Sequence, residues 1–535
     1  MDDSLLPPPA APGSNPAPIR PLERLPTGVP GLDTILLGGF FRGGLYLIVG
    51  EPGTGKTILT NQIAFHHVAT GGPVVYVTLL VETHGRMLAH LQPLAFFAPA
   101  AVARTLHYFS GASVLQEQNL DALLTLLTGL VREQQATLLV LEGFDTAQAV
   151  APSDLALKHF LQALQVTMEV RGCTTLLVAQ AAVPGSLPTR AAVDGLIELC
   201  DQHVGLRRVR QLEVLKFRGS AYLRNPHAFE ITDAGLTVYP RTEALVPLPL
   251  PPLDARRPRL GFGSPGLDAM LHGGPFARSC TMLLGTPGSG KTLLGLHFLA
   301  AGARQGEPGL YFGFDEPPAW LQPKADAIGL DFSRHVAEQR IDLLWQAPLD
   351  SLLDALTAQL LARVRARQVR RVFIDGLSGL EHAQSYPERM FEFFTALVLQ
   401  LRALGVTTVF SAEVTQLFGP EVALPVDYAS GATDNIIFLR YVELHAHLYR
   451  LISIMKMRDS GYDTALREFT ITAQGIAVEA PFAGAEAILT GVARPRSPAW
   501  SGRLANPAGP GDPPRPPPAG EDAAGPPADE RGPGP

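Results

Sequence analysis

Several kinds of residue are scarce in this sequence, and each scarcity excludes a class of protein. The 535 residues include only three cysteines, Cys173, Cys200 and Cys280, which lie far apart and show no CxxC spacing. So few cysteines argue against a disulfide scaffold or a zinc site and favour a reducing compartment. Apolar runs such as residues 45–49 are far shorter than a membrane span, and the acidic, proline-rich start is unlike a signal peptide. We therefore expect a soluble, cytoplasmic protein with no membrane partner.

Positive charge is limited in amount and in kind. The net charge is -7, so the chain has no overall basic character with which to hold nucleic acid, and a nucleic-acid partner is not expected. Only six of the 43 lysine and arginine residues are lysine. Four of those six, Lys56, Lys216, Lys291 and Lys456, lie in motifs that occur twice. Because lysine is a compact point charge and arginine a planar fork, this placement indicates that a point charge is needed at these positions.

Composition divides the chain into two blocks and three proline-rich segments. Residues 1–22 and 489–535 are rich in proline, glycine and alanine, and we expect both to be disordered. Residues 246–258 read as a stiff linker. The remaining blocks, 23–245 and 259–488, are each long enough for one domain, in keeping with a length that suits two to four domains.

The two blocks repeat each other. Lys56 matches Lys291, and Lys216 matches Lys456 at nearly the same offset, which indicates a duplication with small insertions. In each block short apolar runs alternate with helical patterns such as residues 352–367. This alternation predicts an α/β fold with a mostly parallel sheet covered on both faces.

Each block contains a complete GxxxxGK[ST] motif after an apolar run. The two motifs comprise Gly50, Glu51, Pro52, Gly53, Thr54, Gly55, Lys56 and Thr57, and Gly285, Thr286, Pro287, Gly288, Ser289, Gly290, Lys291 and Thr292. In such a P-loop the backbone N–H groups surround phosphates, the lysine reaches the β- and γ-phosphates, and the hydroxyl of the last residue binds Mg²⁺. The sequence therefore predicts two nucleotide sites, with ATP and Mg²⁺ as cofactors.

A P-loop enzyme needs a carboxylate for Mg²⁺ at the end of a neighbouring strand. Asp375 follows an apolar run in the second block and is well placed for this role. Glu142 stands at the equivalent point of the first block, where its extra methylene would move the carboxylate. Asp145, three residues further on, is the weaker alternative.

Acidic residues also follow a second strand, where a water-polarising base is expected. The second block has Asp315 and Glu316 there, and the first block has Glu82. Each of these acids is either the base or an ordinary acid in a solvated loop. Gln180 and Glu413 close another strand in each block, either as sensors of the γ-phosphate or as ordinary polar strand ends.

These residues together resemble the KaiC family of tandem RecA-type P-loop ATPases. The resemblance covers roughly residues 23–485, and its most specific segments are 374–380, 433–437 and 456–458. It implies two RecA-like P-loop domains assembled into a homo-hexameric ring, with ATP bound between subunits. Signalling proteins are the kind of partner expected, and the sequence names none.

The resemblance also implies roles for a basic pair in each block. Lys216 and Arg218, and Lys456 and Arg458, match the residues with which members of this family reach the nucleotide of a neighbouring subunit. Such groups stabilise charge on the transferring phosphoryl group. A solvated basic strand is the alternative interpretation.

Clock members of the family phosphorylate themselves on adjacent serine and threonine residues. In this sequence Ser430 matches one acceptor, and Gly431 occupies the place of the other. A two-site phosphorylation cycle is therefore not expected, whereas Ser430, or nearby Thr433, stays open as a single acceptor.

Four functions follow from these features. The leading hypothesis is a Mg²⁺-dependent ATPase acting as a regulatory ring, in which the second block hydrolyses ATP and the first mainly binds it. The alternatives are a serine/threonine autokinase, a RecA- or RadA-like DNA-dependent ATPase, and a scaffold whose nucleotide only organises the ring. The acidic balance argues against the DNA-dependent enzyme.

Overall fold

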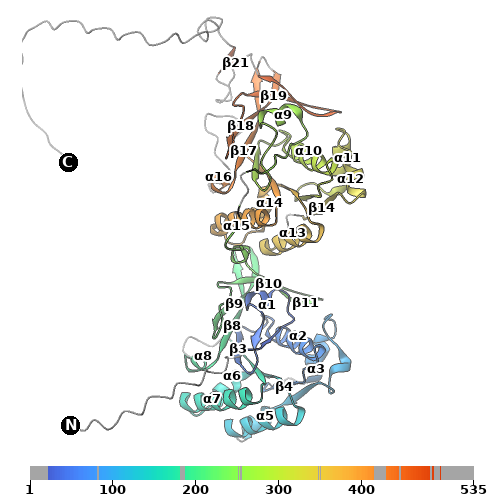
Figure 1. Ribbon diagram of the computed structural model, residues 1–535. Coiled ribbons are helices and arrows are strands. Elements are labelled where there is room, and N and C mark those ends of the chain that lie inside the picture. Colours follow the sequence, from blue (N-terminus) through green and yellow to red (C-terminus); the bar gives the residue numbers. More distant parts are fainter. Residues whose placement is uncertain are drawn as a thin grey trace, which may run out of the picture.

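The computed structural model contains two halves of the same architecture, one beside the other along the molecule (Figure 1). The structure describes residues 22–80, 84–117, 119–180, 187–250, 252, 256–347, 349, 351–414, 429–444, 447–481, 485–486 and 494–495. Two short strand pairs accompany the halves: β1 (Arg24–Leu25) with β2 (Phe40–Phe41), and β21 (Ala485–Glu486) with β22 (Arg494–Pro495).

A nine-stranded sheet forms the centre of the first half, in the order β11-β10-β9-β8-β3-β7-β6-β4-β5. Its strands are β3 (Leu45–Gly50), β4 (Val74–Thr78), β5 (Leu106–Ser110), β6 (Leu138–Glu142), β7 (Thr174–Gln180), β8 (Gly195–Val204), β9 (Arg207–Phe217), β10 (His227–Thr232) and β11 (Gly235–Tyr239). The strands from β8 to β5 are parallel, and β9, β10 and β11 extend one edge in antiparallel fashion.

The sheet of the second half has the matching order β14-β13-β15-β16-β12-β17-β18-β19-β20. Its strands are β12 (Cys280–Gly285), β13 (Gly309–Gly313), β14 (Ile341–Trp345), β15 (Arg371–Asp375), β16 (Thr407–Glu413), β17 (Asn435–Leu444), β18 (His447–Met457), β19 (Arg467–Thr472) and β20 (Gly475–Pro481). The prediction of two α/β units with mostly parallel sheets is confirmed. The antiparallel extension was not predicted. The domain boundaries remain a prediction.

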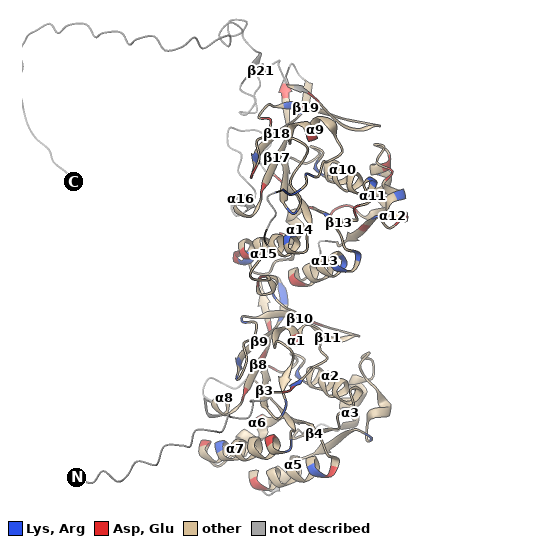
Figure 2. Cartoon of the chain, in the orientation of Figure 1, with Lys and Arg blue, Asp and Glu red and all other residues tan. Residues whose placement is uncertain are grey.

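Helices cover both faces of each sheet. In the first half they are α1 (Leu32–Ile35), α2 (Lys56–Ala69), α3 (His84–Leu91), η1 (Pro99–Ala101), α4 (Ala112–Glu117), α5 (Leu120–Gln134), α6 (Phe144–Val150), α7 (Asp154–Val170), α8 (Leu187–Ala192) and η2 (Thr242–Leu245). In the second half they are α9 (Pro265–Met270), α10 (Lys291–Arg304), α11 (Pro318–Asp326), α12 (Phe332–Ala337), α13 (Leu353–Arg367), α14 (Leu377–Ala383), η3 (Pro387–Arg389), α15 (Met390–Ala403) and α16 (Ala429–Ala432). Charged residues of both signs lie on the outer helices and hairpins, and the central strands are mostly uncharged (Figure 2).

The alternation of side chains along β3 explains why the sheet needs both layers of helices. Tyr46 and Ile48 belong to the apolar cluster that includes α2, whereas Leu47 and Val49 belong to the cluster that includes α5 and α7. Successive residues of a strand point to opposite faces, so a strand with five apolar residues in a row is stable only when both faces are covered. The apolar run thus specifies a central, parallel strand.

A hairpin packs against the P-loop helix in each half. In the first half Gln62 of α2 accepts the N–H of Leu236 at 2.7 Å and donates to its carbonyl at 3.1 Å. In the second half His297 of α10 takes the equivalent place, and its Nε2 accepts the N–H of Ile476 at 3.1 Å. These contacts fix the β10–β11 and β19–β20 hairpins to the helices that begin at the P-loops.

A buried polar cluster joins the two halves at η2. The backbone N–H and the hydroxyl of Thr242 donate to Asp354 at 3.0 and 2.9 Å, and Gln400 donates to the carbonyl of Thr242 at 2.7 Å. Arg389 bridges Asp354 and Glu243, with its shortest contact to each at 3.1 and 2.8 Å. Because Thr242 and Asp354 are 2% and 3% exposed, this seam excludes water and binds the end of the first half to α13 and α15.

A fully buried arginine lies at the start of β15. Arg371 donates to Glu307 at 2.6 Å and to the carbonyls of Gly261 and Phe298 at 2.8 and 3.0 Å. A buried charge needs such partners.

Within the part of the chain that the structure describes, no helix is both long and apolar enough to cross a membrane.

Candidate functional site

Both P-loops have the same place in their halves. Residues 50–57 join the end of β3 to the start of α2, and residues 285–292 join β12 to α10. Gly55 and Gly290, the last residue before each helix, have φ of 101° and 104°, a region that favours glycine. The amino end of each helix, with its free N–H groups, therefore lies beside the carboxyl end of the central strand, where an anion is stabilised.

The P-loop lysines fold back onto their own loops. Lys56 Nζ donates to the carbonyls of Gly50 and Glu51 at 2.7 and 2.8 Å, and Lys291 donates to the two matching carbonyls of its loop, both at 2.9 Å. Burial lowers the pKa of both lysines. Lys291 Nζ also lies 3.5 Å from a carboxylate oxygen of Glu413 at the end of β16. Among the described ion pairs, the P-loop lysine of the second half is thus paired with a carboxylate and that of the first half is not.

A hydroxyl and a carboxylate meet beneath each P-loop. The hydroxyl of Thr57 is hydrogen-bonded to Glu142 in the first half, and Thr292 is hydrogen-bonded to Asp375 in the second. The extra methylene of Glu142 thus does not remove its carboxylate from Thr57. Asp145 instead accepts the N–H of Gln180, at 3.3 Å.

This pair of groups fits Mg²⁺. Mg²⁺ prefers oxygen ligands and keeps several waters, and in nucleotide sites one or two protein oxygens suffice because phosphate oxygens supply others. The described residues contain no cluster of three or more histidine, cysteine or acidic side chains that could hold a metal, so a site built by the protein alone is not seen there. The Thr57–Glu142 and Thr292–Asp375 pairs are the residues that would hold the ion.

Three further carboxylates surround the second site. A Cβ on Gly376 would lie 3.3 Å from Asp315, which places Asp315 next to the Asp375 turn. Burial and the charges of Glu413 and Glu316 raise the pKa of Asp315. Glu316 is paired with Lys324 at 2.7 Å. Of these acids, Asp315 is therefore the one without a described ion pair.

Among the residues that the structure describes, the first half has fewer acids at this point. Glu82, predicted as its base, lies outside the described residues. Gln180, at the end of β7, stands where the second half has Glu413, so this strand end carries no charge. The acidic surroundings of the two P-loops therefore differ.

The basic pair of the first half binds α8 and not the P-loop. Lys216 donates to the carbonyls of Arg190 and Ala191 at 2.9 and 3.0 Å, and Arg218 donates to Ala191 at 3.0 Å. The backbone N–H of Arg218 donates to Asp194, whose own N–H donates to Leu45, the first residue of β3.

The register places this pair away from the P-loop of its own half. Arg218 is level with Leu45, five residues or about 17 Å before the last residue of β3, and Lys216 is level with Leu47, three residues or about 10 Å before it. Both side chains are bound to α8, so the structure does not bring either of them to that P-loop.

The second half repeats this arrangement around α16. Lys456 donates to the carbonyl of Thr433 at 2.9 Å, and Arg458 contacts the carbonyl of Gly431 at 3.2 Å and Asp434 at 3.5 Å. Ser430, the predicted acceptor, lies on α16, directly before Gly431, whose carbonyl Arg458 contacts. Thr433 is buried, with an exposed fraction of 0%.

Sequence reasoning missed several polar residues that are hydrogen-bonded to the carboxylates of Glu142 and Asp375. Tyr76 donates to Glu142 at 2.8 Å, and Tyr311 donates to Asp375 at 3.2 Å. Ser411 also donates to Asp375, at 2.6 Å. The offset between Tyr76 and Tyr311 equals that between the two P-loop lysines, and this match is the signal that could have found them.

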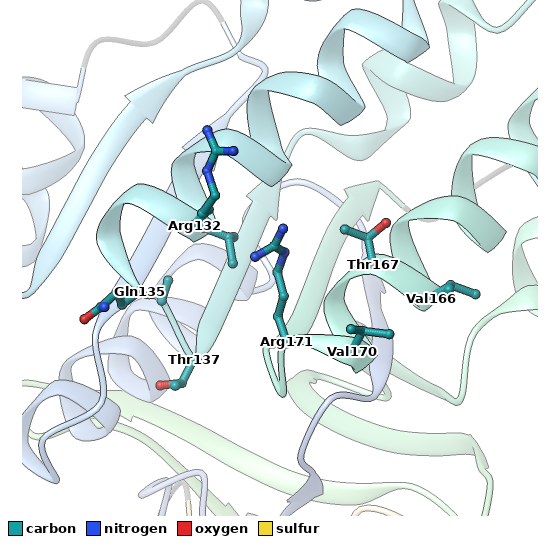
Figure 3. A pocket seen from close by; sticks show the side chains of 9 residues that line it. Arg132, Gln135, Thr137, Val166, Thr167, Val170 and Arg171 are labelled. Atoms are coloured by element: carbon teal, nitrogen blue, oxygen red, sulfur yellow. The ribbon is translucent and has the colours of Figure 1, made fainter.

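A hollow of about 780 Å³ lies at the opposite end of the first sheet, between the ends of α5 and α7 (Figure 3). Arg132, Thr137 and Arg171 line it together with the exposed valines Val166 and Val170. Its lining contains no P-loop residue, so we assign no nucleotide to it.

The chain is similar to known proteins over both halves. A family model described as the KaiC ATPase matches residues 25–243 and again residues 261–482. The circadian clock oscillator protein KaiC of Picosynechococcus sp. is 28% identical over 492 residues, which cover 89% of this chain and 94% of that protein. The circadian clock protein KaiC3 of Synechocystis sp. is 26% identical over 489 residues, covering 88% of this chain and 94% of its own length.

Proposed function

Because this chain belongs to the KaiC family of ATPases, with the family's domain present twice, we propose that it binds ATP with Mg²⁺ at both P-loops and hydrolyses it. The observation that carries the proposal is the repeated juxtaposition of a P-loop, a hydrogen-bonded threonine–carboxylate pair and a helix amino end. This combination suits a triphosphate with its metal ion.

The side chains of the second site suggest how the reaction proceeds. The N–H groups of residues 285–292 would hold the phosphates, and Lys291 would exchange its loop carbonyls for phosphate oxygens, which are stronger acceptors. Thr292 and Asp375 would hold Mg²⁺, which neutralises charge on the phosphates when bound. Asp315 would orient the attacking water, since a carboxylate of raised pKa is the better general base.

The two halves would then divide the work. The second site has Asp315 and Glu413 beside its P-loop, whereas the first has the neutral Gln180 at the corresponding strand end. We propose that the second site supplies most of the hydrolysis and that the first mainly binds ATP.

A homo-hexameric ring accounts for the position of the basic pairs. Lys216 and Arg218 are bound to α8, about 10 and 17 Å along the sheet from the last residue of β3, so a neighbouring subunit would bring its P-loop to them. Lys456 and Arg458 would serve the second site in the same way. Signalling proteins remain the expected partners of such a ring.

One observation favours a second activity, serine autophosphorylation. Arg458 and Lys456 hold α16 through the carbonyls of Gly431 and Thr433, and Ser430 lies on the same short helix. If the basic pair acts on the neighbour's nucleotide, Ser430 would be carried to that γ-phosphate. We propose Ser430 as the acceptor of this alternative activity.

The test is one incubation of the purified chain with γ-labelled ATP and Mg²⁺, beside Lys56→Ala and Lys291→Ala. We expect free phosphate, and we expect Lys291→Ala to reduce it by about a hundredfold or more, since the lysine stabilises the transferring phosphoryl group. Lys56→Ala should reduce it much less. Equal losses in both variants would refute the division of work.

The same incubation separates the alternatives. Label retained on the chain and lost in Ser430→Ala would establish autophosphorylation. Turnover that rises on addition of single-stranded DNA would favour the DNA-dependent ATPase. Tight ATP binding with neither free phosphate nor label would contradict the proposed enzyme and favour a scaffold.

A further inference from the structure

The carboxylate of the first site is held from two sides. Its Oε1 is hydrogen-bonded to the hydroxyl of Thr57, and its Oε2 lies 2.8 Å from the hydroxyl of Tyr76 on β4. Glu142 is 6% exposed and Tyr76 is fully buried, so water cannot replace this contact easily. The Glu142 carboxylate is therefore hydrogen-bonded both to the last residue of the P-loop and to a tyrosine on β4, outside the P-loop.

The protons of this contact can be assigned. An ionised carboxylate only accepts, so the single proton of Tyr76 points to Glu142. The amide nitrogen of Asn61 donates to the Tyr76 oxygen at 3.2 Å and to the carbonyl of Thr57 at 2.8 Å. The hydroxyl of Tyr108 donates to the amide oxygen of Asn61 at 2.8 Å. Each group thus orients the next, and the chain of hydrogen bonds runs from β5 to Glu142.

The second half holds its carboxylate by other means. Ser411 on β16 donates to Asp375 at 2.6 Å, and Tyr311 donates to the other oxygen at the longer distance of 3.2 Å. The sheet register places Ser411 beside Leu283 and Val178 beside Ile48, at the same point of the two sheets. The first half thus has no hydroxyl where Ser411 stands.

The two halves also differ in the residues that orient the tyrosine. By the offset that relates the two P-loop lysines, Leu296 is the counterpart of Asn61, and Leu343 is the counterpart of Tyr108. The second half therefore lacks the polar chain that orients Tyr76, and its tyrosine is a secondary support.

We propose that Tyr76, oriented by Asn61 and Tyr108, is the positioning residue that sets the Glu142 carboxylate for Mg²⁺ in the first site, a task that Ser411 performs in the second. This inference rests on the proposed function, because it concerns the metal of the same site. It predicts that the two sites respond differently to the loss of the equivalent tyrosine.

The experiment measures Mg²⁺ dependence, not turnover. The full-length chain carrying Lys291→Ala isolates the first site, and binding of a fluorescent, non-hydrolysable ATP analogue is titrated with Mg²⁺. We expect Tyr76→Phe to raise the half-saturating Mg²⁺ concentration about tenfold, the usual effect of removing a group that supports a metal ligand. Asn61→Leu, which copies Leu296, should raise it by about threefold, since it only disorients the tyrosine.

Two control variants each remove a tyrosine hydroxyl at another position in the chain. Tyr46→Phe deletes a buried hydroxyl that accepts the N–H of Phe41 at 2.7 Å, away from the P-loop, and should leave the Mg²⁺ dependence unchanged. Tyr311→Phe in a Lys56→Ala background should raise the half-saturating concentration of the second site by less than about threefold.

The outcomes separate this inference from the proposed function. Analogue binding with the same Mg²⁺ dependence in Tyr76→Phe and in its parent would overturn the role of Tyr76 while leaving the nucleotide site intact. No analogue binding by the parent at any Mg²⁺ concentration would overturn the proposed function of the first site. If Tyr76→Phe does not fold, an unchanged Mg²⁺ dependence in Asn61→Leu would count against the inference.

Discussion

Acid should weaken the second half through one histidine. His297 is 4% exposed, and its Nε2 accepts the N–H of Ile476, which requires the neutral ring. Burial, with a smaller contribution from Arg304, lowers its pKa to about 4, against 6.5 for an ordinary histidine. Protons therefore bind the unfolded chain first as the pH falls. The stability that the neutral ring contributes is present above pH 6.5 and is lost progressively towards pH 4.

The size of the effect follows from these two values. At pH 5 the unfolded ring is almost fully protonated and the folded ring almost entirely neutral. Linkage then gives a loss of about 2 kcal/mol in the free energy of unfolding between pH 7 and pH 5. The duplication provides a matched replacement, because Gln62 makes the same contact with Leu236 in the first half and does not titrate in this range. We expect His297→Gln to lose about 2 kcal/mol less than the parent over this interval.

Tryptophan fluorescence allows the second half to be followed by itself. Trp320 and Trp345 lie in that half, the third tryptophan is Trp500, and residues 23–245 contain none. Urea denaturation at pH 7 and pH 5, at one protein concentration and without nucleotide, gives the four free energies needed. Gln62→His is the control, since it should leave the tryptophan-detected transition unchanged.

An equal acid-induced loss in His297→Gln and in the parent would refute the reasoning. The other buried histidine of that half with a lowered pKa, His335, is present in both proteins, so its contribution cancels from the comparison.

Two further predictions concern buried charges, and both are read from tryptophan-detected urea denaturation. Asp354→Ala should lower the free energy of unfolding by about 3 kcal/mol, because it leaves Arg389 and Thr242 with fewer partners in a buried seam, and a change below about 0.5 kcal/mol would contradict this. Glu307→Ala should lower the free energy of unfolding by about 3 kcal/mol, because it leaves the buried charge of Arg371 without its carboxylate. Arg371→Met removes that charge and should lower the free energy of unfolding by less. The reverse order would be inconsistent with the burial of Arg371.

The sequence was sufficient to predict the features that depend on short, local patterns. The run before Gly50 is apolar at every position, which specifies a central parallel strand, and the motif that follows it positions Lys56 at the start of a helix. The duplication then predicted the same arrangement around Lys291. The family and the two mostly parallel sheets were confirmed for this reason.

Contacts between distant segments could not be predicted from such patterns. Arg389 meets Glu243 across 146 residues, and nothing near either residue in the sequence indicates the other. The hydrogen bond between Tyr76 and Glu142 also joins two strands that the chain visits separately. The position of the Glu142 carboxylate stayed open in the sequence for the same reason, because its hydrogen bond to Thr57 joins residues 85 positions apart.

The seam at η2 bears on how independent the two halves are. Thr242 belongs to the first copy of the domain by its place in the chain, yet its partners Asp354 and Gln400 belong to the second. In a second half produced alone from residue 259, Asp354 and Gln400 would lose their hydrogen bonds to Thr242 and would be exposed to solvent. The second copy therefore takes part of its buried polar bonding from the end of the first, so a boundary that keeps residues 242–245 with the second half preserves contacts that a cut at residue 259 removes.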